Sequence, residues 1–222
     1  MIYNNGRVFE GIWMSDKRHG EGYERYSNGN KYEGQFEKGK AHGKGVYYWC
    51  SGEVYDGEWK NGVKEGNGIW KGVDGDSYIG EWRNSKAHGY GVHTWKNGDR
   101  YEGEWDNCLK HGQGTDIFAN GDIYVGTYIR GKPEGEGTYK WKNGSVYHGN
   151  FKNGMKHGKG NWKKGGSNVK SNSYEGDYFM DNKHGYGEFK WASGNVYKGN
   201  YLDDERHGYG EMFWTDGSIY KG

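Results

Sequence analysis

Seven histidines stand at equivalent positions of a repeated sequence pattern, and the imidazole of histidine is a common metal ligand. Zinc holds its ligands at about 2.0–2.3 Å, so two ligating atoms must lie within about 4 Å of each other. If each histidine belongs to its own pair of strands, equivalent histidines lie about 9.6 Å apart and cannot share an ion within one chain. We predict that each closes its own hairpin by hydrogen bonding, and that no metal or other cofactor is bound; a zinc ion bridging two chains is the alternative. The seven histidines are His19, His42, His88, His111, His157, His184 and His207.

Cysteine and carboxylate side chains could supply a nucleophile or an acid–base pair. Cys50 and Cys108 are about three hairpins apart, nearly 30 Å at the same strand spacing, which excludes a disulfide. His42 and His111 are near them in sequence, but equivalent histidines elsewhere have no cysteine beside them, so we interpret both cysteines as structural. Acidic residues recur on the polar side of every predicted hairpin, which indicates a solvated face and not a catalytic pair. They are Glu10, Glu33, Glu58, Glu81, Glu102, Glu104 and Glu175.

Composition excludes several classes of protein. The 222 residues include 44 glycines and 39 aromatic residues, and so many rings argue against disorder. The net charge of +1 is not that of a dedicated nucleic-acid binder. The sequence has no apolar run long enough to span a bilayer and no signal peptide. Two cysteines in 222 residues fit a reducing, cytoplasmic compartment.

The elements that would position these side chains are set by a tandem repeat. The pattern aromatic-x-Gly-x-aromatic begins at nine residues, spaced by 23 except for one interval of 27. We call these repeats 1 to 9 and number positions within each repeat from its first aromatic residue. Residues 1–8 match the end of a preceding repeat, so the predicted array covers 9–222 and looks cut at both ends. The starts are Phe9, Tyr32, Tyr55, Tyr78, Tyr101, Tyr124, Tyr147, Tyr174 and Tyr197, with a truncated tenth at Tyr220.

Each repeat reads as a β-hairpin. Rings occupy positions 1 and 5 and glycines positions 3, 12 and 14 in all nine repeats, with polar residues mostly between them. This period of two is typical of strands, and no helical period appears. Asn-Gly, Ser-Gly or Asp-Gly pairs separate the repeats and predict tight turns. Of the 39 aromatic residues, 32 fall at positions 1, 5, 16 and 18, on the same face as the glycines.

Glycine opposite a ring leaves space for the ring to lie across the neighbouring strand. The predicted fold is therefore all-β, an elongated twisted antiparallel β-meander of stacked hairpins. With strands about 4.8 Å apart, nine hairpins would form a solenoid-like rod of roughly 85–90 Å. Because each hairpin contacts only its neighbours, we expect stability to be nearly a sum over repeats.

The repeat resembles the MORN (membrane occupation and recognition nexus) repeat. The resemblance is carried by Tyr101-Glu102-Gly103-Glu104-Trp105, then His111-Gly112-Gln113-Gly114, and by the equivalent residues of the other repeats. The resemblance implies an elongated, twisted all-β scaffold without catalytic residues. MORN proteins include ciliary radial-spoke components, parasite membrane-skeleton proteins and junctional proteins. MORN repeats also occur in regulatory segments of some phosphoinositide kinases and of a methyltransferase. A targeting or regulatory segment of a larger enzyme is thus an alternative.

We expect a scaffold of this kind to bind a protein partner, with an extended or helical segment of the partner lying in an aromatic groove. The candidate groove residues are Trp59, Trp82, Trp105 and Trp141, although these rings could equally form the core. Open strands at residues 3–7 and 220–222 predict either further repeats or a homo-oligomer formed by end-to-end pairing. The resemblance places such a scaffold in the cytoplasm, in a cytoskeletal, ciliary or membrane-skeleton assembly.

The longer interval contains four extra residues between Gly160 and Tyr174. We interpret this polar stretch as a tolerated loop insertion. It also carries Lys163, Lys164 and Lys170, the candidate anion or lipid patch, and binding to phosphoinositides or anionic membranes is the alternative function. Charge is balanced elsewhere in the chain, which counts against that alternative.

Overall fold

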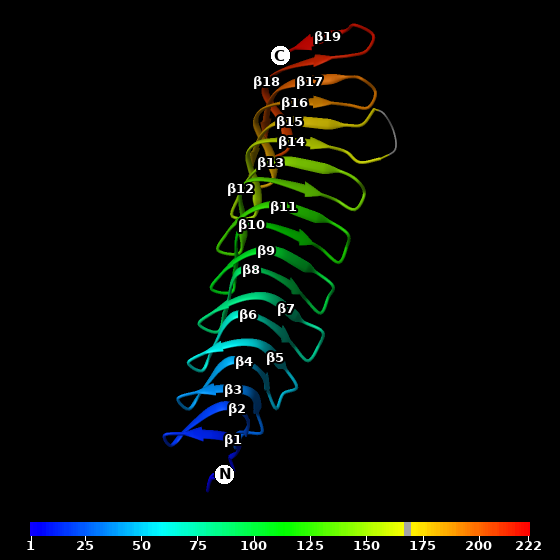
Figure 1. Cartoon of the computed structure of the whole chain (residues 1–222). Coiled ribbons are helices and arrows are strands. Elements are labelled where there is room, and N and C mark those ends of the chain that lie inside the picture. Colours follow the sequence, from blue (N-terminus) through cyan, green and yellow to red (C-terminus); the bar gives the residue numbers. More distant parts are fainter. Residues whose placement is uncertain (167–169) are drawn as a thin grey trace. The chain divides into compact units, whose positions relative to one another are not determined.

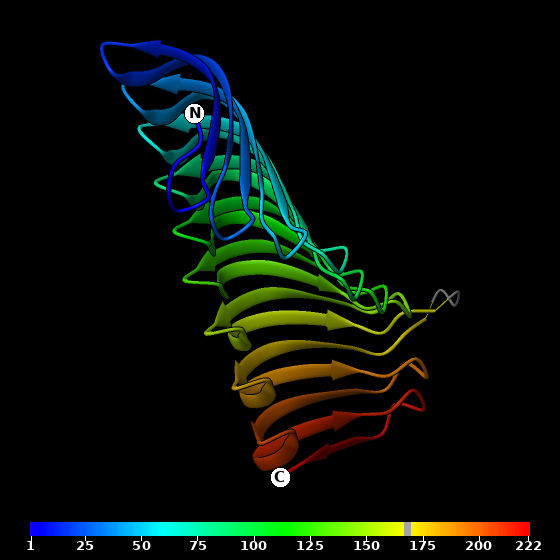
Figure 2. The ribbon, with the colours of Figure 1, turned by 90° about the horizontal axis from the view of Figure 1, so that it is seen from below.

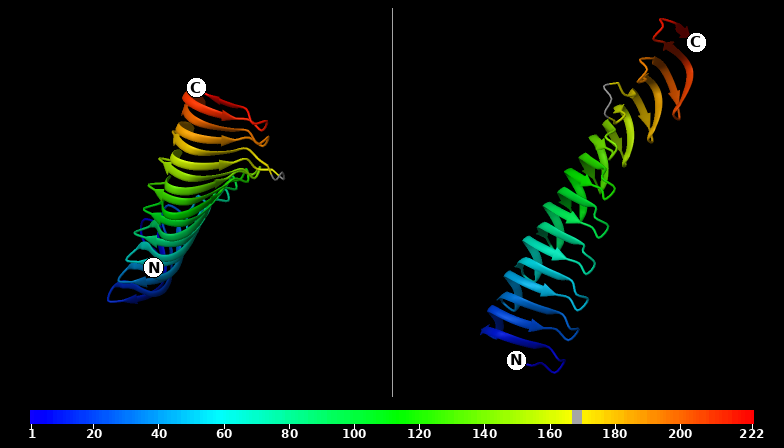
Figure 3. Two further views of the ribbon diagram at one scale, coloured as in Figure 1. Left: turned by 90° about the horizontal axis from the view of Figure 1, so that it is seen from above. Right: turned by 90° about the vertical axis from the view of Figure 1, so that its right-hand side faces the viewer.

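The structure of the chain is a computed structural model that describes residues 1–166 and 170–222. The described residues form no helix, and strands follow one another through the chain (Figure 1). They divide into two compact units, Met1–Leu109 and Lys110–Gly222. Within each unit consecutive strands pair antiparallel, side by side in chain order (Figures 2 and 3). The predicted all-β antiparallel meander is confirmed.

The strands alternate in length between seven and nine residues in repeats 1 to 9. The N-terminal unit contains β1 (Val8–Met14), β2 (Lys17–Arg25), β3 (Lys31–Glu37), β4 (Lys40–Tyr48), β5 (Val54–Lys60), β6 (Val63–Lys71), β7 (Ser77–Arg83), β8 (Lys86–Thr94) and β9 (Arg100–Asp106). The C-terminal unit follows from β10 (Leu109–Ile117), through β11 (Ile123–Ile129), β12 (Lys132–Lys140), β13 (Val146–Lys152), β14 (Met155–Lys163), β15 (Ser173–Phe179), β16 (Asn182–Lys190), β17 (Val196–Leu202) and β18 (Glu205–Phe213), to β19 (Ile219–Lys221).

Two kinds of connection join the strands. Inside each repeat, positions 7 and 8 form a two-residue turn in which both residues have positive φ, as in Lys38 (50°) and Gly39 (85°). Between repeats, apart from the lengthened loop after repeat 7, positions 18 to 22 form a longer connection in which only the glycine at position 21, such as Gly29, has positive φ. The Asn-Gly pairs between repeats lie in tight turns, as predicted: the Gly29 backbone donates to the Tyr26 carbonyl at 3.0 Å, and the Tyr26 backbone donates to the Asn30 carbonyl at 2.9 Å. Asn28 also accepts a hydrogen bond through Oδ1 from the Asn30 backbone, which helps to shape the turn.

A bulge interrupts the hairpin in repeats 1 to 4 and 6 to 9. In repeat 2, Gly34 pairs with Gly45 and Phe36 with Ala41, so three residues of β4 oppose Gln35 alone. The side chain of Gln35 accepts a hydrogen bond from the Lys44 backbone at 3.1 Å, which fills the gap. The side chain at position 4 therefore stabilises the bulge on the polar face and is not merely solvated.

The core is a row of rings laid over glycines. The hydroxyl of Tyr32 donates to the Gln35 carbonyl at 2.9 Å, so its ring lies flat along its own hairpin. A Cβ atom on Gly45 would lie 2.3 Å from the Tyr32 oxygen, which explains glycine at position 14. The Tyr32 ring meets Phe36 and Trp59 edge to face, with centroids 5.0 and 5.4 Å apart. Each position-1 ring inside a unit thus joins its own repeat to the next.

The four-residue insertion leaves the strands in register. Lys163 pairs with Ser173, and the Lys164 backbone still donates to the Asn172 carbonyl at 2.9 Å, as position 18 donates to position 22 elsewhere. The extra residues therefore lengthen one loop, and residues 167–169 of that loop lie outside the described part of the chain.

Candidate interaction surface

The strands bend toward the face that carries the rings. Arg18 and Glu24 are six residues apart on β2, about 20 Å on a straight strand, yet their side chains form an ion pair. Lys110 and Asp116 on β10 repeat this arrangement, with Nζ and Oδ1 2.5 Å apart. The ring face is therefore concave in each unit, and the curvature of the strands is visible in Figure 2.

A second set of rings, at positions 16 and 18, lies on the concave face next to the core rings. In repeat 2 the ring centroids of Tyr47 and Trp49 are 4.7 Å apart. In repeat 4 His93 stacks on Trp95, with 4.3 Å between centroids and 9° between planes. These side chains are half-buried, in contrast to the closed core row, so part of each ring faces solvent. The C-terminal unit has the equivalent pairs Tyr139–Trp141 and Phe189–Trp191. We call this set the open rings.

The four predicted groove residues fall in two places. Trp59, Trp82 and Trp105, at position 5, are only 9%, 8% and 6% exposed. Trp82 is wedged edge to face against Tyr55 and Tyr78, and its indole Nε1 donates to a main-chain carbonyl. These three side chains thus belong to the core and do not line a groove, which agrees with the alternative prediction that they form the core. Trp141, at position 18, is half-buried and belongs to the open rings.

Position 10 adds cations to the concave face in six of the nine repeats. Lys64 Nζ lies 4.1 Å from the ring centroid of Trp82, 5.1 Å from Tyr55 and 5.5 Å from Trp49. Burial lowers the pKa of Lys64, since water is partly excluded from its ammonium group. Lys156 occupies the same position in repeat 7, and burial lowers its pKa likewise. These cation–π sites were not predicted, because only curved strands bring position 10 over the rings.

Two carboxylates at position 16 are also buried on this face. Glu24 is 1% exposed and pairs with both Arg7 and Arg18. Asp116 is 6% exposed, pairs with Lys110, and accepts a hydrogen bond from the Tyr128 hydroxyl at 2.6 Å. Both stand at position 16, where most repeats have a ring, and each has a cation six residues earlier in its own repeat. A carboxylate at position 16 with a cation at position 10 of the same repeat is therefore the sequence pattern that could have indicated these buried ion pairs.

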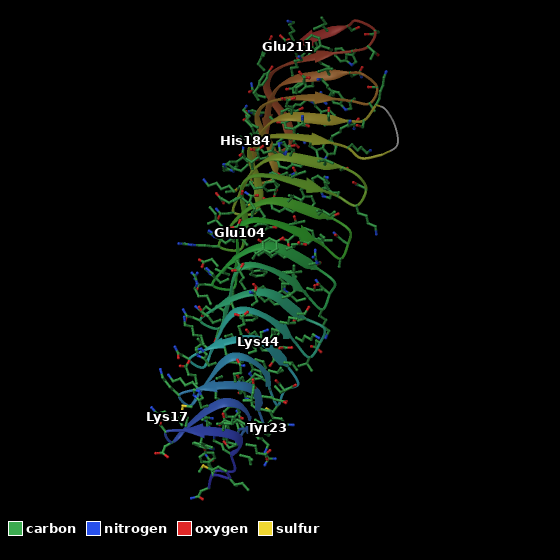
Figure 4. All side chains as sticks on the ribbon, in the orientation of Figure 1. Lys17, Tyr23, Lys44, Glu104, His184 and Glu211 are labelled. Carbon is green, nitrogen blue, oxygen red and sulfur yellow. The ribbon has the colours of Figure 1, made fainter. Side chains whose placement is uncertain are left out.

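The opposite face is polar. Lys17, Tyr23, Lys44, Glu104, His184 and Glu211, labelled in Figure 4, stand at positions of this face. His42 Nε2 lies 3.2 Å from a carboxylate oxygen of Glu37 in its own hairpin, whereas His88 Nδ1 lies 3.3 Å from Asp106 of the next repeat. In residues 1–166 and 170–222, no group of three or more histidine, cysteine or acidic side chains is placed to hold a metal ion. Cys50 and Cys108 are free and exposed.

The lysine patch lies beside the lengthened loop. Lys163 and Lys164, together with Lys142, line a depression of about 550 Å³ whose described lining contains no acidic side chain. Lys170 is exposed on the far side of residues 167–169 and does not line this depression. The structure thus brings two of the three predicted lysines together and adds Lys142 from the neighbouring loop.

The MORN repeat family matches nearly the whole chain. Its matches cover residues 9–31, 32–54, 55–77, 78–100, 101–123, 124–146, 147–165, 174–196 and 197–219, the nine repeats identified in the sequence. MORN repeats generally mediate protein or membrane interactions, and the family is generally non-catalytic. Within the described residues, no helix has the length and apolar character needed to cross a bilayer.

Comparison with solved structures gives weak similarities. The SAS-4 TCP domain of Drosophila melanogaster, in complex with a proline-rich motif of dSTIL, is 13% identical over 81% of this chain and 83% of that chain, with a TM-score of 0.38. An inactive virginiamycin B lyase from Staphylococcus aureus, with quinupristin, is 13% identical over 97% of this chain and 74% of that one, with a TM-score of 0.18. At these TM-scores neither similarity supports an inference. The comparison with curated proteins finds no match.

Proposed function

The chain belongs to the MORN repeat family, and from this premise we propose that it is a non-catalytic scaffold that binds a protein partner on its concave face. The observation that carries the proposal is the set of open rings. Tyr47, Trp49 and Trp141 keep part of their surface in water although a closed core row lies directly beside them. Aromatic side chains of this kind are common anchors in protein interfaces.

The shape of the face favours an extended or helical segment as the bound element. The bend of each strand makes a trough that continues from repeat to repeat inside a unit, and the open rings recur along it at intervals of about 9.6 Å. A partner segment that places apolar side chains at matching intervals would cover several ring pairs at once. The family resemblance supports a cytoplasmic setting for this scaffold, in a cytoskeletal, ciliary or membrane-skeleton assembly.

Peptide selection tests the proposal without requiring that the partner be identified first. A phage-displayed library of random peptides would be panned on the folded chain, and the selected peptides titrated against variants. Trp49→Ala and Trp141→Ala remove open rings, whereas Tyr186→Ala removes a ring that is 56% exposed on the opposite face. We expect Trp49→Ala to weaken the binding of peptides that bind the N-terminal unit at least tenfold, and Trp141→Ala that of peptides that bind the C-terminal unit, since such anchors contribute about 2 kcal/mol or more.

The Tyr186→Ala variant is the matched control and should bind the peptides like the unmodified chain. Circular dichroism would show that all variants remain folded. Peptides whose affinity is unchanged in both tryptophan variants but lost in Tyr186→Ala would contradict the proposal, because binding would then occur on the polar face.

A second candidate function is supported by the depression at the lengthened loop. Lys142, Lys163 and Lys164 surround it without an acidic side chain in its described lining, which suits an anionic lipid headgroup. The test is sedimentation with phosphatidylcholine vesicles that contain or lack phosphatidylinositol bisphosphate. Replacing Lys163, Lys164 and Lys170 by alanine should weaken binding by about fivefold for each lysine that contacts the surface. Equal loss on replacing three lysines of the polar face would remove this candidate.

A further inference from the structure

Four repeats, 1, 3, 7 and 8, place a cation of their own over two core rings. The cation comes from position 10, and the rings are position 1 of the same repeat and position 5 of the next. In repeat 1 the Arg18 guanidinium lies 5.7 Å from the Phe9 centroid and 5.2 Å from that of Phe36. The equivalent groups are Lys64 over Tyr55 and Trp82, Lys156 over Tyr147 and Tyr178, and Lys183 over Tyr174 and Tyr201. The ring faces at this site are thus built to meet positive charge.

Repeat 2 has the rings of this site but lacks the cation. Position 10 is Ala41, and the rings are Tyr32 and Trp59, with centroids 5.4 Å apart. Where a long side chain would lie, the concave face has a depression of about 320 Å³. Ala41, Tyr32 and Trp59 line it, together with the open rings Tyr26 and Tyr47. The space is therefore the site of a missing cation, walled by aromatic side chains.

The other two repeats without a cation at position 10 differ from repeat 2. Ala87 in repeat 4 is only 7% exposed, and Cys108 from the next turn accepts a hydrogen bond from its backbone at 3.3 Å. Pro133 in repeat 6 fills part of the space with its own ring, whose Cδ lies 3.8 Å from the place of a Cβ on Gly154. Ala41 is half-buried. Among these three repeats, repeat 2 combines the smallest side chain with an accessible position.

The surroundings can receive the polar end of a cation. Arg18 donates a hydrogen bond to the Gly39 carbonyl, which belongs to position 8 of the next repeat. Gly62 holds the corresponding place for repeat 2 and lines the depression, so its carbonyl is the equivalent acceptor. A hydrogen-bonded acceptor at this point fixes how deep the cation sits.

The charges around the site must also tolerate another cation. Arg18 and Lys40 line the depression, and Glu24 beside Arg18 is already paired. The chain itself shows that cations can stand at position 10 in successive repeats, since Lys156, Lys183 and Arg206 do so, although Lys183 is paired with Asp204. A weakly hydrated cation loses least on entering such a site, which favours guanidinium or methylated ammonium over a plain ammonium group.

We propose that the depression over Ala41 binds a cationic side chain of a partner protein, an arginine or a lysine, in the place that the chain fills with its own cation in repeats 1, 3, 7 and 8. The inference rests on the proposed scaffold function and names the partner chemistry at one point of the concave face. The incoming cation lies over Tyr32 and Trp59 and donates to the Gly62 carbonyl.

The probes that test this are capped amino acids titrated into the full chain. N-acetyl-arginine methylamide, N-acetyl-trimethyllysine methylamide and N-acetyl-lysine methylamide carry the charge, and N-acetyl-norleucine methylamide is the neutral control. The readout is the indole N–H signal of Trp59 in NMR spectra, assigned with Trp59→Phe. We expect saturable shifts with dissociation constants on the order of millimolar, and arginine and trimethyllysine binding roughly five- to thirty-fold tighter than norleucine.

Two variants close the site from within. Ala41→Lys reproduces the arrangement of Lys64, and Ala41→Met fills the volume without charge; both should abolish the shift. Tyr186→Ala, on the opposite face, should leave it unchanged. Equal binding of norleucine and arginine, or an unmoved Trp59 signal, overturns the proposal. If that signal stays unmoved while Trp49→Ala and Trp141→Ala still abolish peptide binding, the scaffold function stands and the cation site alone is wrong.

Discussion

Lys110 and Asp116 stand six residues apart on one strand, yet the Lys110 Nζ and Asp116 Oδ1 atoms are 2.5 Å apart. The Tyr128 hydroxyl donates to the other carboxylate oxygen at 2.6 Å, so the buried charge of Asp116 is met from two sides. Contact across six residues requires a bent strand. Since a buried ion pair adds little net stability, its main effect is to hold this bend, and with it the concave face.

Breaking this pair should be costly, whereas replacing it should not. Lys110→Met leaves the Asp116 carboxylate buried without its cation, and we expect the free energy of unfolding of the C-terminal unit to fall by about 3 kcal/mol. The double variant Lys110→Ala with Asp116→Tyr reproduces Ala41 and Tyr47 of repeat 2 and should recover most of the loss. Urea denaturation followed by circular dichroism measures both. A double variant no more stable than Lys110→Met would contradict this prediction, because it would show that an alanine and a tyrosine cannot replace the ion pair.

The ring core was predictable from the sequence because it depends on spacing alone. A period of two places Tyr32 and Gly45 on one face, and the 23-residue interval repeats that pairing in each hairpin. The Lys110–Asp116 pair and the cation over Trp82 could not be predicted in the same way. They depend on how far each strand bends. Glycine at position 12, such as Gly43 with a φ of 63°, marks the bulge in the sequence, but it does not give the angle through which the strand bends.

The fit between Tyr32 and Gly45 gives a sharp stability prediction. Gly45 is not in the positive-φ region, so Gly45→Ala tests space and not backbone strain. The new Cβ would lie 2.3 Å from the Tyr32 oxygen, and the ring must move off the hairpin. We expect a loss of about 2–4 kcal/mol in the free energy of unfolding of the N-terminal unit, comparable to losing a core side chain.

The control for that substitution is Gly39→Asp. Gly39 has positive φ with nothing within 4 Å of its added Cβ, and Asp181 and Asp204 occupy the same position in repeats 8 and 9. Its effect should stay within about 1 kcal/mol. Equal losses for Gly45→Ala and Gly39→Asp would mean that the ring-over-glycine packing does not explain position 14.

The two-residue turns allow a stabilising substitution. Position 7 has positive φ in every repeat, and Met180 occupies it at 47° with its side chain 55% exposed. Asparagine tolerates this conformation better than methionine and stands there in four repeats, as at Asn61 and Asn153. Met180→Asn should raise the free energy of unfolding by about 0.5–1 kcal/mol. Thermal denaturation against Leu202→Asn, an exposed strand position, would check it; a Met180→Asn variant less stable than the original chain would contradict it.

Alkaline pH should unfold the chain through its buried phenols. Burial raises the pKa of Tyr124 to about 12, helped by the charge of Asp116, whereas a tyrosine in the unfolded chain ionises near 10. Below about pH 10 both states keep the proton and stability is unaffected; between about 10 and 12 the unfolded state ionises first, so stability falls by about 2–3 kcal/mol for this residue. In Tyr124→Phe, which copies Phe9 at the same position of repeat 1, this contribution disappears, so the free energy of unfolding should fall less steeply across that window. Tyrosinate absorbance and denaturant titrations at stepped pH measure both effects, and an equally steep fall in the variant would show that Tyr124 keeps an ordinary pKa.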